Sequence, residues 1–77
     1  MSDQRSNVMI HVDETLDDER LSAISRAVGE HEGVYSACFS DKARHLMAID
    51  YDPEKMKSAD VLQWVQSQGV HAELFGL

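Results

Sequence analysis

The sequence changes from a period-two pattern to a helical pattern twice, and this repetition constrains the fold more than any other feature. Val8, Ile10 and Val12 alternate with polar positions, which predicts a half-buried strand at Asn7–Glu14. Apolar residues then recur at helical spacing, which predicts an amphipathic helix at Leu16–Glu30. A strand running directly into a helix is therefore the first structural unit.

The second half of the chain repeats this unit after a hairpin. Val34–Phe39 and His45–Tyr51 are expected to be strands joined by a polar turn. A second helix is expected to begin at Ser58 and to close at Gly69, and a last strand to follow at Val70–Phe75. The order β-α-β-β-α-β predicts an α+β, ferredoxin-like sandwich. Its four-stranded antiparallel sheet has the order 4-1-3-2, with two helices on one face.

Local signals place the helix ends and the core. Thr15 is the expected N-cap of the first helix, because Asp18 follows three residues later as in a capping box. Gly33 is the expected left-handed stop after it. The core is expected to contain the inward apolar residues of every element: Val8, Ile10, Val12, Leu21, Ile24, Val28, Val34, Ala37, Phe39, Met47, Ile49, Tyr51, Val61, Leu62, Val65, Val70, Ala72 and Leu74.

Length, charge and cysteine content limit the class of protein. The 77 residues suffice for a single domain at 7–77, after an expected disordered N-terminus at 1–6. The net charge of −7 opposes nucleic-acid and anionic membrane partners, and no apolar run is long enough for membrane insertion. One cysteine excludes an internal disulfide and suits a reducing compartment, so a cytoplasmic location is expected.

Several short segments together resemble the heavy-metal-associated domain, the family of small copper chaperones and of the N-terminal domains of metal-pumping ATPases. The resemblance spans about residues 8–75 and implies the ferredoxin-like fold. The segments that carry it are Val8–Asp13, Gly33-Val34, Tyr51-Asp52-Pro53, Ser58-Ala59-Asp60-Val61-Leu62 and Gly69-Val70-His71-Ala72-Glu73-Leu74.

The resemblance implies a metal site that this sequence does not carry. The family binds soft metal through Met-x-Cys-x-x-Cys in the loop before the first helix, and counting back from Gly33 places the two cysteine positions near Asp17 and Arg20. Thiolates suit soft copper, whereas carboxylates suit calcium or magnesium. The acids of this loop also have a simpler role as first-turn charges at a helix N-terminus. No metal-binding residue is therefore transferred from the family.

Histidines offer a different metal site. His11 and His71 fall on the outward side of neighbouring antiparallel strands, and direct pairing would bring their Cβ atoms to about 5 Å, with Glu73 on the same face. Two imidazoles and a carboxylate suit zinc, nickel or copper(II). The alternative is two exposed histidines on a polar face. His45, at a strand start, is expected to be solvated.

The same outward face carries apolar side chains, namely Met9, Leu46, Ala48 and Phe75. Such a patch is expected to be covered by a homodimer partner or by another protein. The alternative is scattered single apolar residues, which are normal on a surface. The thiol of Cys38 lies on this face too, and nothing near it in the sequence indicates a catalytic role.

These patterns favour a small, non-catalytic binding module that works through its open sheet face, by partner binding or self-association. The alternative is a carrier of a transition metal at a histidine-centred site. An enzyme is not expected, because the sequence contains no glycine-rich phosphate loop and no recognisable nucleophile-histidine-acid set.

Overall fold

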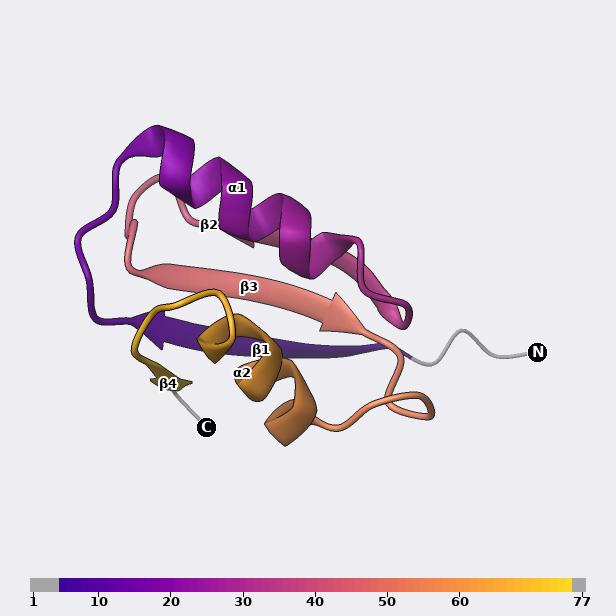
Figure 1. Cartoon of the computed structure of the whole chain (residues 1–77). Coiled ribbons are helices and arrows are strands. Elements are labelled where there is room, and N and C mark those ends of the chain that lie inside the picture. Colours follow the sequence, from indigo (N-terminus) through magenta and orange to yellow (C-terminus); the bar gives the residue numbers. More distant parts are fainter. Residues whose placement is uncertain (1–4, 76–77) are drawn as a thin grey trace.

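The computed structural model describes residues 5–75 of the chain. Its elements follow the predicted order and are shown in Figure 1. They are β1 (Ser6–Val12), α1 (Asp18–Gly29), β2 (Val34–Phe39), β3 (Leu46–Tyr51), α2 (Ser58–Gln66) and β4 (Ala72–Leu74). β1 begins at Ser6, inside the segment expected to be disordered, and residues 1–4 of that segment lie outside the described residues.

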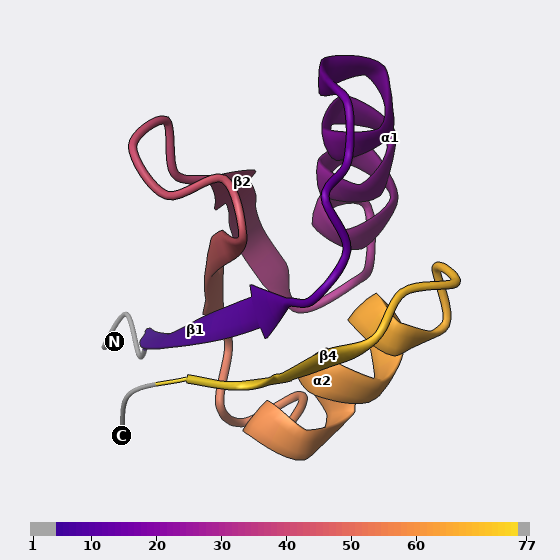
Figure 2. The same cartoon turned by 90° about the vertical axis from the view of Figure 1, so that its left-hand side faces the viewer.

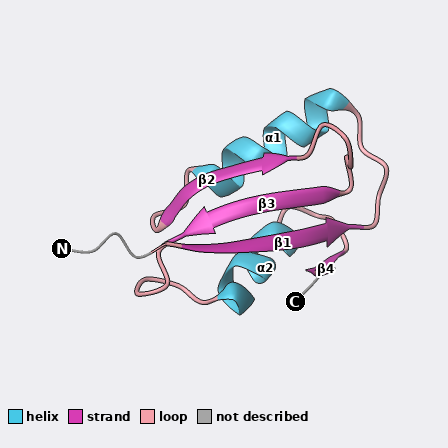
Figure 3. Cartoon of the chain, turned by 180° about the vertical axis from the view of Figure 1, so that it is seen from behind, coloured by secondary structure: helices cyan, strands magenta, loops and turns pink. Residues whose placement is uncertain are grey.

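The four strands form one antiparallel sheet in the order β2-β3-β1-β4, which confirms the predicted topology. β1 is central: it pairs with β3 along Ser6–His11 and with β4 along Ile10–Val12. Both helices cover the same face of the sheet, and the other face is open (Figure 3). β4 runs beside β1 as a short edge strand (Figure 2).

The core lies between the sheet and the two helices. The inward residues of β1, Val8, Ile10 and Val12, are at most 2% exposed. The period-two alternation in the sequence therefore reflects the burial of one face of β1, as predicted. The core also contains Ile24, Val28, Met47, Ile49, Tyr51, Val61, Val65 and Val70 from the other elements.

Two residues depart most from the predicted core. Five others predicted for it are only partly buried and pack against it: Val34, Ala37, Phe39, Leu62 and Ala72. Leu74 is 39% exposed, although it was expected to be buried. It lies on β4, which is an edge strand. The described part of the sheet has no further strand beyond β4 to shield it. Met56, in the loop before α2, is 6% exposed and joins the core without having been predicted. Its thioether fills the space beside Gly33, where an added Cβ atom would lie 3.3 Å from the Met56 sulfur.

The first helix begins later than predicted. Asp17, not Thr15, is the N-cap, and its side chain accepts a hydrogen bond of 2.8 Å from the backbone N–H of Arg20. Asp and Thr are both favoured N-cap types, so residue type alone did not distinguish between them. Gly33 has φ +98°, as expected of a left-handed position after a helix.

β2 contains an irregularity that the sequence did not indicate. Val34 pairs with Tyr51 and Ser36 with Asp50, so Tyr35 is an extra, bulged residue. The bulge lets both Val34 and Ala37 pack against the core. Tyr35 is turned out to solvent, 48% exposed, with the guanidinium of Arg5 at 4.7 Å from its ring centroid.

Ile10 of β1 and its partner Leu74 of β4 differ in burial. This difference predicts very unequal losses of stability when each is truncated to alanine. Ile10 is fully buried and lies opposite Leu74, which is 39% exposed. Ile10→Ala is expected to lower the free energy of unfolding by about 2–5 kcal/mol, because it removes a packed side chain and leaves a cavity. Leu74→Ala, the matched control, is expected to cost less than about 1 kcal/mol. Urea unfolding measures both, and similar losses would contradict the assigned core.

Candidate functional site

One row of side chains crosses the open sheet face from edge to edge. Met9 of β1 lies opposite Ala48 of β3, and Ala48 lies opposite Cys38 of β2. On the other side, the backbone N–H of Phe75 donates to the carbonyl oxygen of Met9 at 2.9 Å. We call Phe75, Met9, Ala48 and Cys38 the central row. It joins three of the four residues predicted for an interface to the predicted thiol.

Polar residues flank the central row on both sides. On one side, Asp50 accepts hydrogen bonds from Asn7 at 2.7 Å and from Ser36 at 3.3 Å. On the other side lie His11 and its neighbours, with Glu73 opposite it in β4 and Leu46, the fourth predicted interface residue, opposite it in β3. The open face is therefore an apolar band with a largely polar and acidic border.

A cluster of rings covers one end of this face. The ring of His11 stacks on His45 at 5.7 Å between centroids and lies 6.3 Å from the ring of Phe75. His45 was expected to be solvated, but it is half-buried and its Nδ1 lies 2.8 Å from the carbonyl oxygen of Val12. The turn before β3 carries His45 to this position, and the sequence did not indicate the geometry of that turn.

The structure brings only part of the predicted histidine site together. His11 lies opposite Glu73 and not opposite His71. His71 immediately precedes β4, and its carbonyl oxygen accepts from the N–H of Asp13 at 2.9 Å. The Nδ1 atom of His11 lies 3.2 Å from Asp13 Oδ1, and it makes no hydrogen bond within the described part of the chain. His11 and His71 are therefore diagonal neighbours, about 7–8 Å apart by strand geometry.

His71 is instead tied to the loop before α1. Its backbone N–H donates to the Glu14 carboxylate at 3.0 Å, and its ring Nδ1 lies 2.7 Å from Glu14 Oε2. The hydrogen bond from the His71 ring lowers the pKa of the Glu14 carboxyl. The same hydrogen bond, aided by the negative charge, raises the pKa of the His71 imidazole. This contact links two loops that are distant in sequence.

A second contact reinforces that link. It is made by Arg20, which lies near one of the two positions where the family resemblance implies a cysteine. The guanidinium of Arg20 donates to the carbonyl oxygen of Gln68 at 2.9 Å. Asp17, near the other such position, is occupied as the helix cap. Glu14 and Asp17 thus hold the loop between β1 and α1, and Arg20 holds the first turn of α1, each with a defined structural partner.

Three further features bear on metal, membrane and thiol chemistry. Among residues 5–75, no group of three or more His, Cys, Asp or Glu side chains is arranged to hold a metal ion. No helix in that part of the chain is both long and apolar enough to cross a membrane. Cys38 is a free, exposed thiol at the end of the central row.

Solved structures with the same architecture include a copper-binding domain from HMA7, a P-type ATPase. It superposes with a TM-score of 0.82 at 18% identity, over 95% of this chain and 96% of that one. The chain has the fold of heavy-metal-associated domains. Oxidized MerP from Ralstonia metallidurans CH34 gives a TM-score of 0.81 at 12% identity, over 95% of this chain and 100% of that one.

The CopZ metallochaperone shares the fold as well, with a TM-score of 0.73 at 20% identity, over 91% of this chain and 100% of that one. No protein-family model matches the chain, and no curated protein sequence matches it. The fold implied by the sequence resemblance is thereby confirmed at the level of structure. These similarities describe the backbone arrangement and not the residues that occupy the loop before α1.

The Glu14–His71 contact predicts a bell-shaped contribution to stability with pH. Because the pKa of His71 is raised above 6.5, its contribution is present below that pH and lost as pH rises through the raised pKa. Because the pKa of Glu14 is lowered below 4.5, its contribution is present above that pH and lost as pH falls through the lowered pKa. The contact therefore stabilises the fold most between these two pH values.

Thermal unfolding of the wild type and of His71→Gln, measured from about pH 3 to about pH 9, tests this. The difference in Tm is expected to be largest in the window and to shrink at both ends. Glu14→Gln is expected to give the same profile, and the double variant no further loss. A difference in Tm that does not vary with pH would contradict the assignment.

Proposed function

We propose that this chain is a non-catalytic binding module that acts through its open sheet face, by docking a partner protein or a second copy. The observation that carries the proposal is the central row, in which Phe75, Met9 and Ala48 lie side by side across three strands. Phe75 is 47% exposed. Met9 and Ala48 beside it are half-buried. An exposed aromatic side chain next to a partly exposed methionine is typical of binding surfaces.

The charge of the chain favours a partner over a second copy. Each copy carries a net charge of −7, and the border of the central row includes Asp50, Glu73 and, beside His11, Asp13. Two such faces repel each other, whereas a partner with an apolar centre and Lys or Arg at its border complements the face in both respects. The proposed partner is therefore a protein with a basic-rimmed apolar surface.

Two equally exposed aromatic residues allow a matched test. Phe75 is 47% exposed within the central row, and Tyr35 is 48% exposed at the bulge outside it. Phe75→Ser is expected to weaken binding of a partner by at least about tenfold, as loss of an aromatic anchor does, and Tyr35→Ser to leave it within about twofold. Parallel affinity capture with the wild type and both variants identifies the partner, and calorimetry measures its affinity.

The thiol of Cys38 provides an independent readout. It is exposed at the end of the central row, so a docked partner is expected to slow its reaction with a thiol reagent such as DTNB. Equal capture by Phe75→Ser and the wild type, with unchanged thiol reactivity, would contradict the proposal. A concentration-dependent dimer mass in light scattering, abolished by Phe75→Ser, would make a second copy the occupant.

A metal carrier is the second candidate, and the pairing of His11 with Glu73 favours it. The ring of His45, stacked on His11, would add a further nitrogen to such a site. Two of the solved structures with this fold are described as a copper-binding domain and a metallochaperone. We rank this candidate below partner docking, because His71 is already paired with Glu14.

Titration with Zn(II), Ni(II), Cu(I) and Cu(II), followed through the histidine ring signals by NMR, separates the two candidates. If docking is the function, we expect no binding tighter than millimolar, since no three His, Cys, Asp or Glu side chains of residues 5–75 converge to hold a metal ion. Micromolar binding that is lost in His11→Ala and retained in His31→Gln would establish the carrier instead. His31 is a suitable control because it packs against Trp64, away from the open face.

A further inference from the structure

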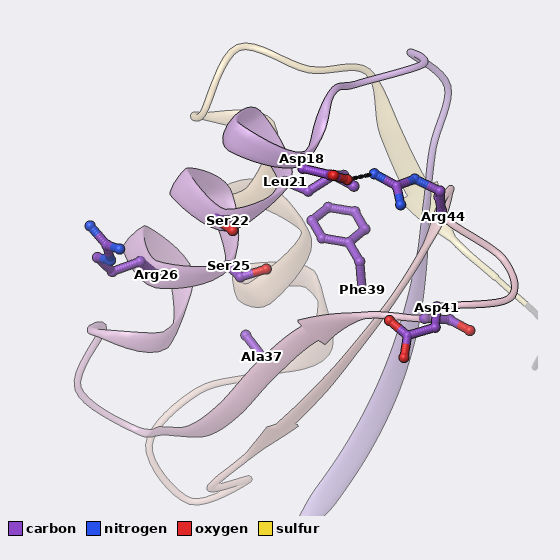
Figure 4. A pocket seen from close by; sticks show the side chains of 10 residues that line it. Asp18, Leu21, Ser22, Ser25, Arg26, Ala37, Phe39, Asp41 and Arg44 are labelled. Atoms are coloured by element: carbon purple, nitrogen blue, oxygen red, sulfur yellow. Dashed lines mark hydrogen bonds and ion pairs between the residues drawn. The ribbon is translucent and has the colours of Figure 1, made fainter.

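A groove runs between helix α1 and strand β2, on the helix-covered side of the sheet. It has a volume of about 530 Å³ and lies over Leu21, Ala37 and Phe39. Figure 4 shows Leu21 and the ring of Phe39 side by side at its base, with Ser22 and Ser25 along the helix wall. The groove therefore has an apolar base bounded by a strand on one side and a helix on the other.

The strand that forms this wall has unused hydrogen-bonding groups. β2 is an edge strand whose one neighbour in the described sheet is β3. The N–H of Ser40 donates to the carbonyl oxygen of Leu46 at 2.9 Å, so Ser40 faces β3, and Cys38 does likewise because antiparallel bonding alternates. The backbone N–H and C=O groups of Ala37 and Phe39 consequently point away from β3, along the open edge.

The side chains and the backbone groups of this edge are therefore placed to contact the same ligand. Ala37 and Phe39 turn their side chains to the groove, since they pair with the buried residues Ile49 and Met47. Donors and acceptors repeated every second residue are matched by an extended peptide. Its residues opposite Ala37 and Phe39 would also point their side chains into the groove.

Opposite charges at the two ends of the groove favour one orientation of a segment bound in it. Arg26 lies at the end nearest the start of β2, and Asp41 at the end that follows β2 (Figure 4). Arg44 and Asp18 pair with each other across the groove near Asp41. Among the described residues, Arg26 and Asp41 form no ion pair. One positive and one negative group are therefore available, at opposite ends of the groove.

We propose that this groove binds an extended segment of a partner protein, which adds an antiparallel strand to β2. The segment carries a basic residue near Asp41, then aliphatic residues over Phe39 and Ala37, then an acidic residue near Arg26. These four side chains alternate with outward-facing ones, as in a strand with one buried face. Antiparallel addition is favoured because it is the more stable pairing per residue.

A second copy of this chain fits the groove less well. Its own edge strand carries Ser36 and Cys38 between the inward residues and no basic residue before them in the required position. Two copies would also bring together chains with a net charge of −7 each. This proposal goes beyond the one for the open sheet face, from which it is independent, because the two surfaces lie on opposite sides of the sheet.

The direct test is titration of the isotope-labelled chain with the synthetic peptide Lys-Thr-Val-Thr-Val-Thr-Glu, blocked at both ends, followed by amide NMR. Saturable shifts are expected at the amides of Ala37 and Phe39 and along α1 near Ser25. The charge-exchanged peptide Glu-Thr-Val-Thr-Val-Thr-Lys has the same composition and is expected to bind about two- to fivefold more weakly, because exposed charge pairs contribute little each.

Two matched pairs of variants locate the site. Ser25→Phe fills the groove and is expected to weaken binding by at least about tenfold, whereas Ala23→Phe adds the same ring to α1 outside the groove and leaves binding unchanged. Ala37→Pro removes one outward N–H without removing a bond to β3, and is expected to weaken binding similarly. Ala59→Pro makes the same substitution in the first turn of α2, outside the groove, and is expected to bind like the wild type.

Several outcomes would overturn the proposal while leaving the open-face proposal intact. These are the absence of shifts up to millimolar peptide, equal binding by Ser25→Phe and Ala23→Phe, and tighter binding of the charge-exchanged peptide. Shifts confined to Met9, Ala48 and Phe75 would assign the peptide to the open face instead. A dimer with protected Ala37 and Phe39 amides in the peptide-free protein would assign the groove to a second copy.

Discussion

The burial of Val8, Ile10 and Val12 along one side of β1 is the constraint on which the rest of the structure depends. β1 is hydrogen-bonded on both edges, so its inward side chains sit under both helices, at most 2% exposed. Side chains alternate along a strand, and a slip of one residue would exchange its two faces. The same free energy that buries Ile10 therefore also holds Met9 and His11 on the open face.

The fold was predictable because its signals are local and repeated. Period-two runs, a helical stripe and glycines after the helices determine the element order, and only a few topologies satisfy that order. The outward parity of Met9, Ala48 and Phe75 followed from the same alternation. That these three side chains form a single row could not be predicted in the same way. It depends on the offset of β4 relative to β1, which depends in turn on the loop before β4.

Side-chain positions set by loops were the ones that sequence reasoning missed. His45 reaches the open face from a turn, Met56 enters the core from a loop, and Asp17 displaces Thr15 as the cap. The pairing of His71 with Glu14 joins loops 57 residues apart, and no local pattern encodes such a contact. Loop conformation depends on tertiary contacts and not on propensity, so these positions require a structure.

The bulge at Tyr35 has a consequence for how this protein avoids uncontrolled assembly. An edge strand with a long regular ladder is a template on which further strands stack without limit. Here the bulge interrupts the ladder after Val34, and the exposed ring of Tyr35, under the cation of Arg5, stands beside the interruption. The regular part of the edge is confined to the last few residues of β2, long enough for one short segment and too short to seed a fibre.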